Sequence, residues 1–159
     1  MHEPTVLHHT FTILRSYSKP PSRVYSAFAD PLKKRRWFAE GMSHDVEEFE
    51  MQFEVGGCER ARYRFRAGTQ FSGMALIHEA SFLEIVPEKR IVAASTMGFE
   101  TKRFSASLVT FEFIADAQGT RLHFTHQGAF FEGADGPEIR ESGWQQLLSQ
   151  LQTEMSQDA

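Results

Sequence analysis

The chain has 159 residues, of which 41% are hydrophobic and 24% are charged, and its formal net charge is −4. This length and composition are typical of one globular domain and exclude a disordered chain. The acidic balance gives no reason to expect a nucleic-acid partner, and no apolar run reaches the roughly 18 residues of a membrane span.

The N-terminal residues and the cysteine count bear on the compartment. No basic stretch followed by an apolar one opens the sequence, so we expect no secretory signal. Cys58 is the only cysteine, which excludes an internal disulfide and a multi-cysteine metal site. Together these features predict a cytoplasmic protein.

The first predicted elements are one strand and two short helices. Alternation over 6–17 predicts the strand, and the segment PPSRVYSAFAD predicts a helix with prolines in its first turn. Asp30 is expected to cap a second helix that begins at Pro31 and ends in the buried pair Trp37 and Phe38.

Turn residues then separate six further strands and one long helix. The strands are expected at 44–55, 59–67, 71–85, 90–98, 104–115 and 120–128, and the helix at 135–157. Asp135 and Glu138 suggest a capping box at the helix start. The apolar face of the helix comprises Ile139, Gly143, Trp144, Leu147, Leu148, Leu151 and Met155. The order β-α-α-β6-α predicts a single α+β domain over 1–159, a curved antiparallel sheet around a C-terminal helix.

Charge pairing suggests a register for the second and third strands. A three-residue loop over 56–58 would pair Val55 with Glu59 and would set Glu54, Glu50 and Glu48 opposite arginines. The row of alternate arginines over 60–66 would then be a neutralised outer face and not a nucleic-acid stripe. In this register Glu59 lies on the inner, apolar face.

Several segments together resemble a known superfamily. They are PPSRVYSAFADPLKKRRWF, FEVGG, FLEIVPEKRIV, SLVTFEF, GTRLHFTHQGAFFEG and SGWQQLLSQL, in that order. The chain resembles the SRPBCC superfamily, the helix-grip fold of START domains and the birch-pollen allergen. Within it, the chain looks most like bacterial homologues of the activator of heat-shock-protein ATPase (AHSA-type). The resemblance implies a ligand-holding scaffold.

The sequence departs from this resemblance in two places. The eukaryotic activator resembles this chain only in its C-terminal domain, and the domain associated with chaperone docking has no counterpart in this sequence. Family members often carry large aromatic residues on the fifth strand, where this chain has Ala93 and Ser95. The second departure indicates a roomier cavity.

Alternation places small residues beside large ones on the inner face of the sheet, which predicts an apolar cavity beneath the helix. The helix side chains could instead fill that space. Glu59 could be a solvated rim residue or a buried polar anchor, and His126 a satisfied wall residue or a functional one. The facing of the strand that carries His78 is ambiguous. The candidate ligand-binding residues are Trp37, Glu59, Tyr63, His78, Ala93, Ser95, Ser107, Phe111, Phe124, His126 and Trp144.

No metal site, cofactor motif or activated cysteine is expected. His123 and His126 are three residues apart on a strand and so face opposite ways. No glycine-rich phosphate loop or serine elbow is present.

Three functions remain open. The first is binding of a small hydrophobic molecule, such as a lipid, a polyketide-like or an aromatic compound. The second is a cyclase or hydrolase that uses Glu59 and His126 as acid–base groups. The third is an accessory protein that binds a chaperone through its surface. The sequence also leaves a homodimer open.

Overall fold

The computed structural model of this protein describes residues 3–157. Its seven strands form one antiparallel sheet in the order β1-β7-β6-β5-β4-β3-β2. They are β1 (Leu7–Tyr17), β2 (His44–Met51), β3 (Cys58–Phe65), β4 (Ala75–Val86), β5 (Arg90–Phe99), β6 (Lys102–Asp116) and β7 (Gly119–Phe130). The predicted α+β architecture is confirmed, with β2 to β7 as a meander and β1 beside β7.

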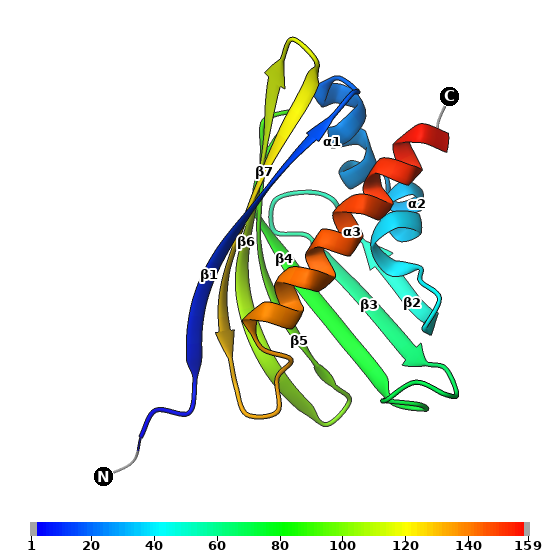
Figure 1. Cartoon of the computed structure of the whole chain (residues 1–159), viewed down its shortest axis with the longest axis vertical. Coiled ribbons are helices and arrows are strands. Elements are labelled where there is room, and N and C mark those ends of the chain that lie inside the picture. Colours follow the sequence, from blue (N-terminus) through cyan, green and yellow to red (C-terminus); the bar gives the residue numbers. More distant parts are fainter. Residues whose placement is uncertain (1–2, 158–159) are drawn as a thin grey trace.

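The helices lie on the concave side of the sheet. They are α1 (Pro21–Ala29), α2 (Pro31–Lys34), the π-helical segment η1 (Arg35–Ala39) and α3 (Pro137–Gln157). The long helix α3 crosses the concave face obliquely, and α1 and α2 lie toward its C-terminal end (Figure 1). The predicted cap is confirmed, because Asp30 Oδ1 accepts a hydrogen bond from the backbone N–H of Leu32 at 2.9 Å.

The hydrophobic core lies where α1, η1 and the C-terminal half of α3 meet the sheet. Trp37 is only 1% exposed, and its Nε1–H donates to the carbonyl of Ala27 at 2.8 Å. The ring of Phe28 packs against Trp37 at 4.9 Å between centroids. The Tyr17 hydroxyl donates to the carbonyl of Leu148 at 2.8 Å, which ties β1 to α3.

The two halves of α3 are covered differently. Leu148, Leu151 and Met155 are buried, as predicted. Ile139, which was predicted to lie on the packed face, is 65% exposed, and Trp144 is only partly buried. The helix begins at Pro137, and the Asp135 carboxylate accepts two hydrogen bonds from Arg140 at 2.8 Å each. The N-terminal half of α3 therefore stands off the sheet.

The predicted pairing of the second and third strands is wrong by four residues. Met51 pairs with Glu59, where Val55 was expected, and Phe49 pairs with Ala61. The connection spans 52–57, because Gly56 and Gly57 exchange backbone hydrogen bonds with Phe82 of β4 instead of closing a tight hairpin. A shift by four residues keeps the side chains from Glu48 to Met51 on their faces, and Glu59 still points inward. Ahead of the bulge in β2 the shift is five residues, so Val46 pairs with Tyr63 and also faces inward.

The arginines of β3 form a neutralised outer face, as predicted, although with different partners. Arg60 pairs with Glu48 and Glu79 at 3.2 and 2.7 Å. Glu47, beside a bulge in β2, binds Arg62 and Arg64 at 3.0 and 2.8 Å. In the part of the chain that the structure describes, no helix is long and apolar enough to cross a membrane.

Two tryptophans should differ in their contribution to stability. We expect Trp37→Ala to lower the free energy of unfolding by about 3–5 kcal/mol, since it removes a fully buried ring. We expect Trp144→Ala to cost about half as much, since this ring borders open space. Urea denaturation followed by circular dichroism measures both, and equal costs would contradict the uneven packing of α3.

Candidate functional site

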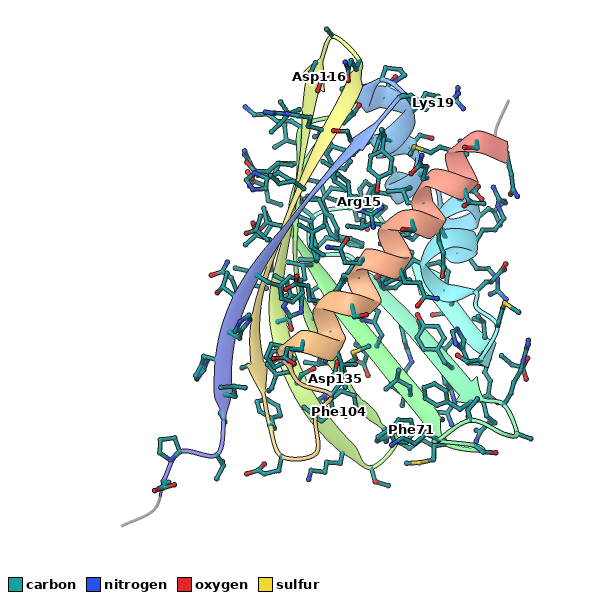
Figure 2. All side chains as sticks on the ribbon, in the orientation of Figure 1. Arg15, Lys19, Phe71, Phe104, Asp116 and Asp135 are labelled. Atoms are coloured by element: carbon teal, nitrogen blue, oxygen red, sulfur yellow. The ribbon has the colours of Figure 1, made fainter. Side chains whose placement is uncertain are left out.

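A cavity of about 420 Å³ opens between the N-terminal half of α3 and the inner face of the sheet. Its walls come from η1, from β2 to β7 and from α3, and they are largely apolar. Asp135 lies at the N-terminal end of α3, near the end of the sheet that carries Phe71 and Phe104 (Figure 2). We call this space the outer cavity.

A smaller recess of about 30 Å³, the volume of a single water, lies deeper in the molecule. We call it the inner recess. Its walls include Lys34, Glu59, Ala93 and Phe111. The two spaces share a boundary made of Phe38, His78, Ser95, Val109 and Trp144.

Three ionisable side chains from three elements meet at this boundary. The Lys34 ammonium donates to Glu59 Oε1, and His78 Nε2 donates to Glu59 Oε2, each over 2.9 Å. The exposed fractions of the three side chains are 7%, 4% and 11%. We call these residues the Lys34–Glu59–His78 cluster.

Aromatic rings hold the lysine of this cluster in place. Its ammonium lies 4.6 Å from the ring centroid of Phe38 and 5.5 Å from that of Trp37. Both rings belong to η1, whose wider turn follows Lys34 directly. π-helical turns of this kind occur frequently at functional sites.

The cluster fixes the charge of Glu59. Burial alone would raise the pKa of this carboxyl group, but the Lys34 charge and the hydrogen bond from His78 outweigh it and lower the pKa to about 2. Glu59 is therefore an anion at neutral pH and is not itself a proton acceptor. Burial also raises the pKa of Tyr63, so its hydroxyl stays neutral.

His126 has different surroundings. Its ring stacks on Phe11, with centroids 4.7 Å apart and planes 7° apart. It also lies over Gly128, where an added Cβ would come within 2.8 Å of His126 Cε1. Burial lowers the pKa of His126 to about 4, with a further contribution from the Arg140 charge, so the ring is neutral. Its Nδ1 is buried without a hydrogen-bond partner among the described residues.

The structure brings together most of the residues expected to bind ligand. The outer cavity or the inner recess is lined by Glu59, Tyr63, His78, Ala93, Ser95, Phe111, His126 and Trp144. Three expected residues line neither space. Trp37 and Phe124 are core residues, and the Ser107 hydroxyl is buried without a hydrogen-bond partner among residues 3–157.

Sequence reasoning missed Lys34, Phe38 and Arg140. Lys34 lies three and four residues before Trp37 and Phe38, so helical spacing alone could have placed all three on one face. Arg140 is buried and bound to Asp135 and to the Ser105 hydroxyl, at 2.8 Å in each case. No group of three or more potential metal ligands occurs within the described residues.

The acid response of stability should separate Glu59 from His126. Each has a folded-state pKa below its ordinary value, so the unfolded chain binds more protons and stability falls on acidification. The contribution of His126 is lost between about pH 6.5 and 4, and that of Glu59 between about pH 4.5 and 2. Urea unfolding at a series of pH values measures the free energy of unfolding. In His126→Gln this free energy should change less between about pH 6.5 and 4 than in the wild-type protein.

The corresponding Glu59 variant tests the lower window. Glu59→Gln should flatten the profile only below about pH 4.5, while lowering stability at neutral pH because Lys34 loses its partner. Identical profiles for the two variants would contradict the assigned burial.

Comparison with known proteins agrees with this architecture. The family model described as "Activator of Hsp90 ATPase homolog 1-like protein" matches residues 18–156. A search of curated proteins finds no significant match.

Solved structures of bacterial proteins share the fold. The Mll3558 protein from Rhizobium loti is 42% identical, with a TM-score of 0.85, and the match covers 95% of this chain and 99% of that one. A protein from Rhizobium leguminosarum is 32% identical, with a TM-score of 0.87 and coverage of 96% and 97%.

A more distant structure supports the fold alone. The AHSA1-like protein from Aeromonas hydrophila is 17% identical, with a TM-score of 0.69 and coverage of 94% of each chain. Because the family model spans β2 to β7 and nearly all of α3, the chain belongs to the Activator of Hsp90 ATPase homolog 1-like family, within the SRPBCC superfamily.

Proposed function

We propose that this protein binds a small, largely apolar molecule in the outer cavity. The observation that carries the proposal is the cavity itself, about 420 Å³ in volume between α3 and the sheet. Ligand sites for small molecules typically measure about 300–1,000 Å³ and combine apolar walls with a few polar groups. An aromatic compound, a polyketide-like molecule or a short lipid has the matching size and character.

The walls support an apolar ligand held in one orientation. Val109, Met97 and Leu147 supply apolar contact, and the Trp144 ring offers a flat face. Polar groups are few, and Ser95 and His78 lie together where the outer cavity meets the inner recess. A polar group on the ligand would therefore point toward this boundary or toward Asp135 and Arg140, which line the cavity at the N-terminal end of α3.

The two other functions have less support. A surface-binding accessory protein would need no internal space, whereas here α3 stands off the sheet. An acid–base pair of Glu59 and His126 would require contact between the two side chains. The carboxylate of Glu59 instead binds Lys34 and His78.

Binding of a naphthalene-sulfonate dye tests the proposal. We expect saturable binding by the folded protein, read from dye emission and from quenching of Trp144. Ser95→Phe should weaken binding by about tenfold or more, which is about 1.4 kcal/mol, because the added ring occupies the cavity.

A matched variant controls for the added ring. Ser81 lies on the exposed outer face of β4, so Ser81→Phe should leave the dye affinity unchanged. Wild-type protein that is folded but binds no dye would overturn the proposed function.

A further inference from the structure

The hydration lost by the buried charges of the Lys34–Glu59–His78 cluster offsets much of the stability that their mutual attraction adds. Each buried charge loses its hydration, and apolar residues of similar volume often stabilise a fold as well or better. The neighbours of the cluster are apolar and would accept such residues, since Phe28, Phe82, Ile91 and Val109 line the same recess. A charged cluster at a cavity wall, and not in the close-packed core, therefore requires an explanation other than packing.

The hydrogen bonds determine the protonation of the histidine. A carboxylate only accepts hydrogen bonds, so His78 Nε2 must carry the proton that it shares with Glu59 Oε2. In the neutral ring, Nδ1 then carries the free lone pair. Lys34 occupies the second carboxylate oxygen and keeps Glu59 ionised, so Glu59 can stabilise an imidazolium without itself taking the proton.

The free nitrogen belongs to a ring that ligands can reach. His78 lines both the outer cavity and the inner recess, and its Nδ1 makes no hydrogen bond within residues 3–157. The ring is positioned by the Phe38 ring, 5.2 Å away between centroids. A histidine oriented by a carboxylate and facing a binding cavity has the arrangement of a general base.

We propose that the cavity is a catalytic site for proton transfer, in which His78 is the general base for a neutral, apolar substrate with an acidic C–H group. This inference rests on the proposed function, because the substrate would occupy the outer cavity. Nδ1 takes the proton, and the electron pair of the broken C–H bond stays on the substrate. The imidazolium then returns the proton to another substrate atom or to solvent. Glu59 and Lys34 are positioning residues.

A reaction that needs only a base and an apolar site tests the proposal. The probe is 5-nitrobenzisoxazole, a small neutral aromatic compound. A base removes its ring C–H proton, the electron pair forms the nitrile, and the N–O bond breaks to leave a coloured nitrophenolate. No oxidant, reductant or second substrate is required. We expect turnover above the buffer rate, and inhibition by the naphthalene-sulfonate dye in proportion to its occupancy.

Three variants locate the base. His78→Gln should lower the rate by about 100-fold, within the range of general-base effects, while its amide can still donate to Glu59 and preserve the fold. Glu59→Gln should lower kcat with little change in KM, since the imidazolium that forms during proton transfer loses its counter-charge. His123→Gln is the matched control. It removes a histidine 3.7 Å from Glu112 on the outer face and should change neither kcat nor KM.

Glu59 from β3 binds His78 directly, and Lys34 from α2 binds the other oxygen of that carboxylate. The other titratable and charged groups that line the outer cavity with His78 are His44, Tyr63, His126, Asp135 and Arg140. An unchanged rate in His78→Gln, with the probe still displacing dye, would overturn the catalytic proposal and leave the binding function intact. A loss confined to His126→Gln would also overturn it. Folded wild-type protein that binds neither dye nor probe would remove the proposed function itself.

Discussion

The structure depends on one geometric constraint, which is that a single helix must cover the concave face of a seven-stranded sheet. The C-terminal half of α3 meets this constraint with Leu148, Leu151 and Met155, assisted by α1 and η1. The N-terminal half lies over the other end of the sheet, where Ile139 is exposed and Gly143 adds no side chain. The cavity is thus the region that α3 leaves uncovered, and the core holds the helix in place from the opposite end.

The buried charges lie between these two regions. Lys34 belongs to the short α2 helix, Glu59 to the start of β3 and His78 to β4. The cluster therefore joins the helical layer to two strands. Arg140 and Asp135 form a second ion pair at the open end of α3. Both polar groups border the outer cavity, whereas the core between α1, η1 and β6 is aromatic and aliphatic. At the closed end, the buried Glu154 of α3 binds Arg36 of η1, so buried charge occurs near both ends of the helix.

The sequence was sufficient to predict which residues of β3 face inward, but not their partners on β2. Alternation depends only on the parity of the register, so Glu59 and Tyr63 were placed inward although the pairing was wrong by four residues. Charge complementarity could not select the register, because Asp45, Glu48, Glu50 and Glu54 offer carboxylates in several alignments. The deciding contacts join Gly56 and Gly57 to Phe82, which lies on a third strand.

The same distinction explains what could be predicted of the candidate site. Pattern reasoning identified inward residues one strand at a time, so it offered His126 as the acid–base partner of Glu59 and left the facing of His78 ambiguous. His78 and His126 differ in their contacts with other strands. The carboxylate of Glu59 binds His78, which pairs with Ala61 across β3 and β4. His126 lies on β7, and its ring stacks on Phe11 of β1. Helical spacing could place Lys34 on the face of Trp37 and Phe38, but its ion pair with Glu59 follows only from the docking of α2 over β3 and β4. Side-chain direction is a local property of the chain, whereas the chemistry of the site depends on which strands and helices become neighbours.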